Sequence, residues 1–328
     1  MAKRPTLKDV AQAAGVSLAT VSYALNNRGS VGQPTREHVL KIAAELGYRP
    51  NLSAKATRTG RSGAIGLIVP DLTNPFFPSL AQIIIQTARH HDYSVFLTNT
   101  EGEPAAERQA AQQLVERGVD GIIWFPIADM DTAGPVLGST PTVVVDRSLP
   151  EHDMVHADYE AGGRVAAKYL IDRGHERIGV ISSPLVVLNG RQRSRGAIDY
   201  IEEHAALTWH VESEFTVDLD PEVVRALVSE GATGIVAGAD LIAIGAIRAL
   251  HAAGKRVPED VSVIGFDDIP WAQLNSPRLT SVAMPIEEMG EEAVAMLMRR
   301  IASPGDAKRR VVFNVTLSER DSVGPPPR

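Results

Sequence analysis

The sequence contains no cysteine, so it can form neither a disulfide nor a thiolate metal site. It also has no apolar run long enough to cross a bilayer, and its first residues, MAKRPTLKDV, are not followed by the apolar core of a signal peptide. A chain without disulfides suits a reducing compartment. We therefore expect a soluble cytoplasmic protein without membrane attachment, and a secreted solute-binding protein is disfavoured.

The patterns of common catalytic and cofactor sites are absent as well. No G-x-G-x-x-G follows a strand-like run, and there is neither a G-x-x-x-x-G-K-[ST] phosphate loop nor a G-x-S-x-G nucleophile elbow. The pairs His90–His91 and His152/His156 lack accompanying metal-ligand spacings. We expect no catalytic residue, no cofactor and no metal site, and hence a protein that is not an enzyme.

Aromatic residues are scarce, at 5% of the chain, whereas hydrophobic residues reach 44%, so we expect sizeable, mostly aliphatic cores. A length of 328 residues fits two or three compact units. The net charge of -7 is unevenly divided: residues 1–62 hold ten Lys or Arg and three acids, a balance of +7, which leaves -14 for the remainder. A cationic head on an acidic body favours nucleic-acid binding, because phosphate attraction then stays local to the head.

The stretch TLKDVAQAAGVSLATVSYALN (6–26) predicts two short helices joined by a tight turn. Thr6, with Asp9 three residues later, can cap the first helix, and Ser17 can cap the second. Gly15 supplies the backbone freedom that the turn needs. The pattern predicts a helix-turn-helix whose second helix enters a DNA groove.

A third helix, capped by Thr35, is expected to run to about Leu46. From Ala64 onward, short β-branched runs alternate with amphipathic helical segments in two series, which is typical of parallel sheets. The predicted fold class is a small all-α helix-turn-helix head followed by an α/β core of two parallel-sheet lobes. We also expect a strand near 211–217, a last strand over 309–317 that completes the first lobe, and a loose C-terminal tail, GPPPR.

Open α/β sheets bind ligands beyond the carboxyl ends of their strands, in the space between two lobes. Residues just after the predicted strands are therefore candidates for a small-molecule site. Arg193 facing Asp267 across a cleft would offer donors and acceptors to a polyhydroxy or heterocyclic ligand. Phe76 and Phe77 have the alternative of being ordinary core. The candidates are Asp71, Asn74, Phe76, Phe77, Trp124, Asp146, Asn189, Arg193 and Asp267.

The run DVAxxAGVSxATVSxxLN, followed by TREHVLKIAAELGYRPN, resembles the headpiece of the lactose-repressor and galactose-repressor (LacI/GalR) family. In the core, PDLTNPFF, Arg193 and Asp267 match positions where relatives hold the effector. The resemblance implies a core similar to a periplasmic sugar-binding protein. It divides the chain into a helix-turn-helix headpiece (1–50), a hinge helix and linker (51–62) and an effector-binding and dimerisation core (63–328), with lobe 1 at about 63–155 plus 283–317 and lobe 2 at about 156–282.

The resemblance further implies a sequence-specific repressor that binds a pseudo-palindromic operator in nucleoid DNA as a homodimer, with a tetramer left open. A sugar, nucleoside or related metabolite in the cleft would switch it. The alternative is a metabolite-binding or sugar-modifying protein whose basic head is only an interaction module. Residues at matching positions are Leu18, Ala19 and Tyr23 for base reading, Thr6, Ser17, Thr20, Ser22, Asn26 and Tyr48 for the DNA backbone, and Asn51, Ala54, Lys55, Thr57 and Arg58 for a hinge in the minor groove.

Three positions depart from the family pattern. Ala239 stands where relatives commonly have Asn before the residue matching Asp240, and Met284 stands where Gln often occurs. Both changes remove polar groups, and each unmade buried hydrogen bond costs roughly 1–3 kcal/mol. We therefore expect an effector that is less hydroxylated or more aromatic than a simple hexose. Thr57 replaces the usual leucine wedge, which predicts a shallower DNA kink or another register of insertion.

Overall fold

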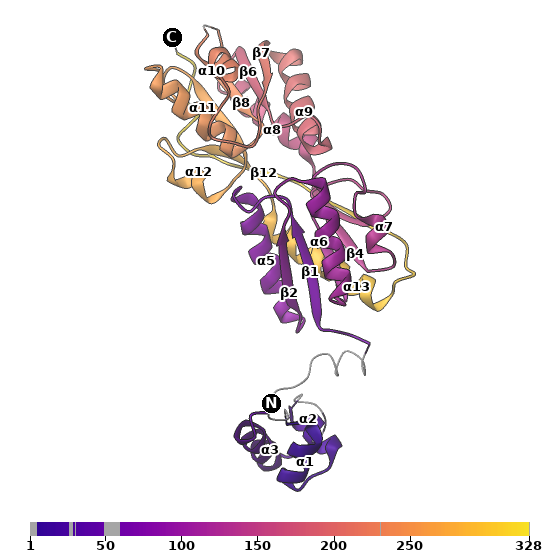
Figure 1. The fold of residues 1–328 in the computed structure, drawn as a ribbon. Coiled ribbons are helices and arrows are strands. Elements are labelled where there is room, and N and C mark those ends of the chain that lie inside the picture. Colours follow the sequence, from indigo (N-terminus) through magenta and orange to yellow (C-terminus); the bar gives the residue numbers. More distant parts are fainter. Residues whose placement is uncertain (1–4, 26–28, 30, 49–59, 230, 328) are drawn as a thin grey trace. The chain divides into compact units, whose positions relative to one another are not determined.

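The computed structural model describes residues 5–25, 29, 31–48, 60–229 and 231–327 (Figure 1). The chain forms two compact units, Met1–Ser62 and Gly63–Arg328. The described part of the first unit is helical, and the second is built from two mainly parallel sheets with helices, which confirms the predicted fold class. None of the described helices combines the length and the apolar character needed to cross a membrane.

The first unit is a three-helix head whose helices pack around the fully buried Val10, Val21 and Val39. Thr6 caps the first helix as predicted. Its hydroxyl accepts a hydrogen bond from the Asp9 N–H (3.4 Å), and the Asp9 carboxylate accepts one from the Thr6 N–H (2.7 Å). The helices are α1 (Leu7–Ala14), α2 (Leu18–Leu25) and α3 (Gln33–Glu45).

The turn between α1 and α2 is also formed as predicted. Gly15 has a φ of +64°, in the left-handed region that favours glycine. The Ser17 hydroxyl then accepts a hydrogen bond from the Thr20 N–H at 3.0 Å, which caps α2. Local hydrogen bonds and the Gly15 conformation thus form the turn between the two helices.

The start of α3 differs from the prediction. The helix begins at Gln33 with Gly32 as its N-cap, two residues before Thr35. Pro34 fits the first turn of a helix, where no backbone N–H is needed. The predicted Thr35 cap is therefore wrong.

The first sheet of the second unit has the strand order β11-β5-β4-β3-β1-β2, and every neighbouring pair is parallel. Helices α5 and α13 pack on one face and α6 and α7 on the other. The elements are β1 (Ala64–Val69), α5 (Phe76–His90), β2 (Ser94–Asn99), α6 (Pro104–Glu116), β3 (Gly121–Trp124), α7 (Gly134–Leu137), β4 (Thr142–Val145), β5 (Asp153–Ala157), α13 (Ile286–Ala302) and β11 (Arg310–Phe313).

The second sheet has the order β12-β10-β9-β8-β6-β7, and only its edge strand β12 is antiparallel to its neighbour among the described pairs. Helices α8 and α9 cover one face and α10 and α11 the other. The elements are α8 (Tyr159–Ile171), β6 (Arg177–Ser182), α9 (Leu188–His204), β7 (Ala206–Glu212), α10 (Pro221–Val228), β8 (Gly234–Ala237), α11 (Asp240–Ala252), β9 (Ser262–Asp267), α12 (Pro270–Leu274), β10 (Thr280–Ala283) and β12 (Thr316–Ser318).

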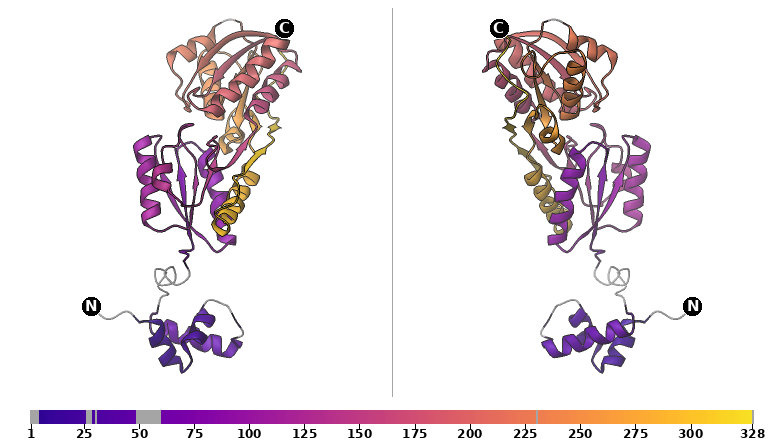
Figure 2. Two further views of the ribbon diagram at one scale, coloured as in Figure 1. Left: turned by 90° about the vertical axis from the view of Figure 1, so that its right-hand side faces the viewer. Right: turned by 90° about the vertical axis from the view of Figure 1, so that its left-hand side faces the viewer.

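The chain passes between the two sheets more often than predicted. After β10 it returns to the first sheet through α13, which lies along that sheet in both views of Figure 2. The expected single strand over 309–317 is instead two strands: β11 extends the first sheet, and β12 goes back to the second. Each lobe is therefore closed by a strand from the end of the chain.

The C-terminal segment is docked on the second sheet, so the expected loose tail is wrong. The Ser322 hydroxyl donates to the Val263 carbonyl (2.6 Å), and the Gly324 N–H donates to the Ser262 hydroxyl (3.0 Å). The Gly324 carbonyl accepts from His175 Nε2 at 3.0 Å. The partners are a backbone carbonyl, a hydroxyl and an imidazole of other segments, which a tail sequence does not reveal.

The strand expected near 211–217 lies five residues earlier, as β7. In β7 the exposed Thr208, His210 and Glu212 alternate with the half-buried Leu207 and Trp209, which is the pattern of an edge strand with one solvated face. Such a strand carries fewer apolar residues than the buried strands beside it. Its start is consequently easy to miss in a search for β-branched runs.

Two glycines set the distance between α8 and α9. A Cβ at Gly196 would lie 1.9 Å from the Glu160 carbonyl oxygen, and one at Gly163 would lie 1.9 Å from the Arg193 carbonyl oxygen. The backbones of the two helices therefore touch, which only glycine permits. This contact fixes where α9 presents its side chains.

We predict that Gly196→Ala destabilises the second unit, because the new methyl group must push α9 away from α8. Overpacking costs about 1–3 kcal/mol and outweighs the gain of up to about 1 kcal/mol from alanine's helix propensity. Urea denaturation of the full chain measures this as a lower midpoint. Gly305→Ala is the control, since its Cβ meets no atom within 4 Å. Equal midpoints for the two variants would contradict the prediction.

Candidate functional site

The first candidate surface is the outer face of α2. Leu18 and Tyr23 are 48% and 51% exposed, and Ala19 is exposed beside them, while Val21 and Ala24 of the same helix are buried. The three predicted base-reading side chains thus share the solvent face of the helix. Two apolar groups and one phenol suit thymine methyl groups and a single hydrogen bond, because none of them is a bidentate donor.

The hydroxyl residues predicted to contact the DNA backbone surround this face. Ser17 is exposed and Thr20 and Ser22 are half-buried, and the Ser17 and Thr20 hydroxyls lie 2.8 Å apart. Thr6 is exposed at the start of α1, whereas Tyr48 is half-buried against the head's core. The remaining predicted DNA contacts, Asn26, Asn51, Ala54, Lys55, Thr57 and Arg58, lie outside the described residues.

Gly29, which the sequence did not single out, lies against the Tyr23 ring. A Cβ there would come within 3.2 Å of Tyr23 Cγ, and the φ of Gly29 is +72°. The backbone at Gly29 therefore packs against one side of the Tyr23 ring. This contact limits the rotation of the Tyr23 side chain.

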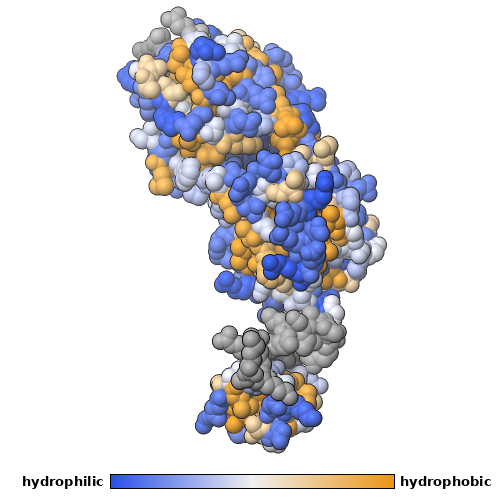
Figure 3. Space-filling model, viewed as in Figure 1, coloured by the Kyte–Doolittle hydropathy of each residue, from blue (hydrophilic) through white to orange (hydrophobic). Residues whose placement is uncertain are grey.

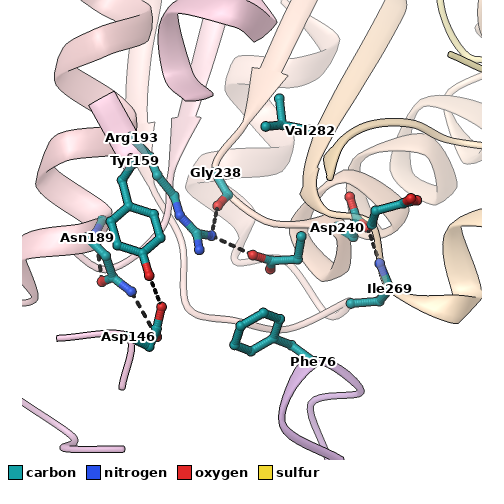
Figure 4. Close-up of polar contacts among 12 residues, drawn as sticks. Phe76, Asp146, Tyr159, Asn189, Arg193, Gly238, Asp240, Ile269 and Val282 are labelled. Carbon is teal, nitrogen blue, oxygen red and sulfur yellow. Dashed lines mark hydrogen bonds and ion pairs between the residues drawn. The ribbon is translucent and has the colours of Figure 1, made fainter. Parts of the chain in front are cut away.

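The second candidate site lies where the two lobes of the second unit meet. It gathers Asp146, Asn189 and Arg193 (Figure 4), and Asp267 pairs with Arg193. Asp146 follows β4 of the first sheet and adopts a φ of +65°. Its buried carboxylate accepts hydrogen bonds from the Tyr159 hydroxyl and from Asn189 Nδ2 (3.2 Å). Tyr159 begins α8 and Asn189 lies in α9, so one carboxylate joins the two lobes.

Arg193 is the centre of the second-lobe side of this site. Its Nη1 donates to the Gly238 carbonyl (2.9 Å) and lies 2.9 Å from Asp267 Oδ1. The sequence predicted that Arg193 and Asp267 face each other across a cleft, but both lie in the second lobe and pair directly. Its guanidinium carbon lies 4.0 Å from the centre of the Phe266 ring and 5.1 Å from that of Tyr159. The buried Nε of Arg193 has no partner among the described residues, so the site retains donor capacity.

Burial raises the pKa of Asp267 to about 6; the Arg193 guanidinium opposes this and the Asp146 carboxylate adds to it. The backbone at Asp267 and Asp268 has φ values of +108° and +53°, which L residues rarely adopt. A conformation of this kind persists only when its surroundings hold it. The surrounding structure therefore holds the Asp267 carboxylate, a hydrogen-bond acceptor, in a fixed position.

Asp240 supplies that support from the start of α11. Its fully buried carboxylate accepts from the Ile269 N–H (2.8 Å) and from the Ser281 hydroxyl (2.6 Å), as Figure 4 shows in part. Burial, together with the nearby Asp267 carboxylate, raises the pKa of Asp240 well above its usual range. Asp240 thus ties the segment after β9 to α11 and positions Asp267.

The candidates after β1 build a turn that starts α5. Asp71 Oδ1 accepts from the Thr73 N–H (2.7 Å), and Asn74 Oδ1 accepts from the Phe76 N–H (3.1 Å). Phe76 and Phe77 are both buried, with ring centres 5.3 Å apart in an edge-to-face arrangement. The Phe76 ring points towards the polar group in Figure 4.

Trp124 does not join this group. It is fully buried, and its indole N–H donates to Glu107 Oε1 of α6 at 2.8 Å. Successive residues of a strand point to opposite faces, so Trp124 faces α6 while the next residue, Phe125, packs against Phe77. The prediction that Trp124 lines the cleft is wrong.

Asp129 is a second contact between the lobes that the sequence did not reveal. Its Oδ2 accepts from the Leu188 N–H at the start of α9 (2.6 Å) and from Arg191 Nη2 (3.0 Å). The loop that carries it is held by Glu107, which accepts from the Ile127 N–H (3.0 Å). Asp129 and Asp146 of the first lobe therefore each accept a hydrogen bond from α9. No motif marks Asp129, because its partners lie about sixty residues away.

Two protein-family models match the chain. Residues 6–51 match the bacterial regulatory proteins of the lacI family, and residues 167–323 match the periplasmic binding protein-like domain. The matched ranges contain the helix-turn-helix face and the Asn189, Arg193 and Asp267 group.

The similarity extends over most of the chain. This chain is 36% identical over 303 residues to a ribose operon repressor of Halalkalibacterium halodurans, and the match covers 90% of each chain. Among solved structures, the lac repressor dimer bound to operator and the anti-inducer ONPF is 26% identical with a TM-score of 0.85, covering 98% of this chain and 100% of that one. A LacI family transcriptional regulator from Enterococcus faecium with bound ribose is 29% identical with a TM-score of 0.72, covering 80% and 99%. The chain therefore belongs to the lacI family of bacterial regulatory proteins.

Proposed function

We propose that this protein is a transcriptional repressor that binds a pseudo-palindromic operator as a homodimer and is switched by a small molecule held between the lobes of its core. The observation that carries the proposal is the capped helix-turn-helix of a basic head, whose α2 exposes Leu18, Ala19 and Tyr23. Relatives in its family are named as repressors, and none of those cited here is named as an enzyme. A protein that acts on chromosomal DNA belongs in the cytoplasm.

The dimer would form through the core, with the heads on two half-sites of the operator. Exposed apolar side chains are available for this on both lobes: Phe96 and Leu97 on β2, and Trp271 and Leu274 on α12. On the face seen in Figure 3 such residues are interspersed with hydrophilic ones. The expected division of the chain, with a head at 1–50, a hinge at 51–62 and a core at 63–328, belongs to the same proposal.

For the effector we propose a sugar of pentose size or a related nucleoside. Arg193, Asp267 and Asn189 offer both donors and acceptors to ring hydroxyls, and a relative of the same fold is named with ribose bound. Ala239 and Met284 are buried and apolar, so neither side chain can bond to a sugar hydroxyl. A hexose would therefore lack partners for some of its hydroxyl groups. Calorimetry against pentoses, hexoses and nucleosides tests this choice; tight binding of a simple hexose alone would contradict it.

The switch would act on the lobe contacts that end on α9. A ligand bound to Asn189 and Arg193 competes with or reinforces the bonds from Asp146 and Asp129, and so changes how the lobes meet. A ligand shifts such an equilibrium only by its difference in affinity for the two arrangements. A gel-shift titration with and without the ligand gives the direction of the switch.

We predict that Tyr23→Ala changes the preferred operator sequence, because Tyr23 would contact a base and each mismatched base pair of a site costs about 1–3 kcal/mol. Lys55→Ala is the contrasting variant: removal of a phosphate contact weakens binding to all sequences alike and lowers the salt slope by about 1. Binding-site selection from randomised half-sites at fixed salt measures both. A uniform scaling of all sequences by both variants would refute this division of roles.

We also predict that effector affinity falls as the pH drops below about 6, the pKa of Asp267. Ligand hydroxyls donate to the ionised carboxylate, so ligand binding favours that form and protonation opposes it. Below the pKa, Kd should rise up to tenfold per pH unit, and above it Kd should be constant. Calorimetry from pH 5 to 7.5 tests this with Asp267→Asn as control, which should bind weakly with a flatter profile; a flat wild-type profile would speak against the role of Asp267.

A further inference from the structure

A pocket beside Asp146 holds more positive charge than its own residues neutralise. It lies next to the Asn189 and Arg193 group. One of its cations, Arg147, directly follows the candidate Asp146, and the other, Arg310, comes from a segment that the sequence did not assign to ligand binding. The residues around it include Asp146, Arg147, Ser148, His156, Gln192 and Arg310.

Arg147 is the buried cation of this pocket, with an exposed fraction of 7%. Its Nη1 donates to the Asp146 carbonyl (2.7 Å) and pairs with the Asp146 carboxylate. That carboxylate also accepts from Tyr159 and Asn189, so its acceptor capacity is shared. Arg147 Nε is buried and has no hydrogen-bond partner among the described residues. A buried donor of a charged group without a partner is costly, and a ligand acceptor would relieve that cost.

Arg310, at the start of β11, is the second cation. Its Nε donates to His156 Nε2 at 2.8 Å, and His156 Nδ1 donates in turn to the Ala157 carbonyl at 2.9 Å. His156 therefore accepts as a neutral ring, and its burial, helped by the Arg310 charge, lowers its pKa. No carboxylate in the described part of the chain lies within ion-pair distance, 4.0 Å, of Arg310. Its guanidinium group is therefore not paired with a carboxylate.

We propose that Arg147 and Arg310 form a subsite for a phosphate group of the effector, which makes the effector a phosphorylated sugar or nucleoside. This inference rests on the proposed function. One carboxylate faces two guanidinium groups, and hydroxyl groups of a neutral sugar could accept hydrogen bonds from them but would not balance the remaining charge. A phosphate supplies several acceptor oxygens and the missing negative charge together.

The space enclosed in the present arrangement is about 10 Å³, room for a single water. A phosphate therefore enters only when the lobes part or the Arg310 side chain turns. Arg310 is exposed and tied at one nitrogen, so it is free to turn towards an anion. Entry of the phosphate would thus be coupled to the lobe contact at Asp146.

The test uses matched pairs of probes on the full chain in phosphate-free buffer: D-ribose with D-ribose 5-phosphate, D-glucose with D-glucose 6-phosphate, and adenosine with AMP. Calorimetry should show that the phosphorylated member of one pair binds at least tenfold tighter than its neutral partner. Arg310→Gln should reduce that affinity at least tenfold, and inorganic phosphate should compete.

Arg309→Gln is the control, because it removes the same charge from the neighbouring exposed residue outside the pocket and should leave the preference unchanged. The proposal is overturned if the neutral member binds as tightly, if no phosphorylated probe binds, or if both variants lose affinity equally. A neutral sugar that binds and shifts operator binding would sink this inference while supporting the proposed function. Absence of any operator binding would instead count against the proposed function.

Discussion

The carboxylate of Asp146 is the interaction on which the core depends. Asp146 follows β4 of the first sheet, and its carboxylate accepts hydrogen bonds from Tyr159 of α8 and Asn189 of α9. One contact between the two lobes therefore consists of hydrogen bonds to a single buried charge. A buried charge is tolerated only while its bonds are complete. Any ligand that takes or adds a bond there changes the balance between the lobes, and this gives a binding site the means to act as a switch.

The helix α9 connects the contacts between the lobes to the packing of the second lobe. Asn189 and Arg193 lie on it, Asp129 binds its first turn, and Gly196 presses it against α8. Because the two backbones are in contact, α9 cannot adjust alone to a change at its side chains. The head needs no such network: its three short helices are held by local caps and a small valine core, so the exposed face of α2 is formed within the head itself.

The sequence predicted best what is local. The Thr6–Asp9 cap, the Gly15 turn and the buried strands followed from short-range patterns, and the place of Asp267 followed from the end of a strand. It failed where partners are distant. Strand β5 carries Asp153, and a buried strand rarely contains a charged residue. Here the charge is paired, because Arg300, 147 residues later, donates to Asp153 at 2.7 Å. The face of Trp124, the bond from Asp129 to α9 and the docked C-terminus depend likewise on groups that only the folded chain brings together.

The central claim is that ligand held at Asn189 and Arg193 is energetically coupled to operator binding. The most direct measurement is the operator Kd of the full chain at rising concentrations of a ligand found by calorimetry, for the wild type and for Asn189→Ala. The account predicts at least a fivefold change in the wild-type Kd, a coupling of about 1 kcal/mol or more, and a markedly smaller change in the variant at saturating ligand. An operator Kd that stays constant while the ligand saturates the core would contradict it.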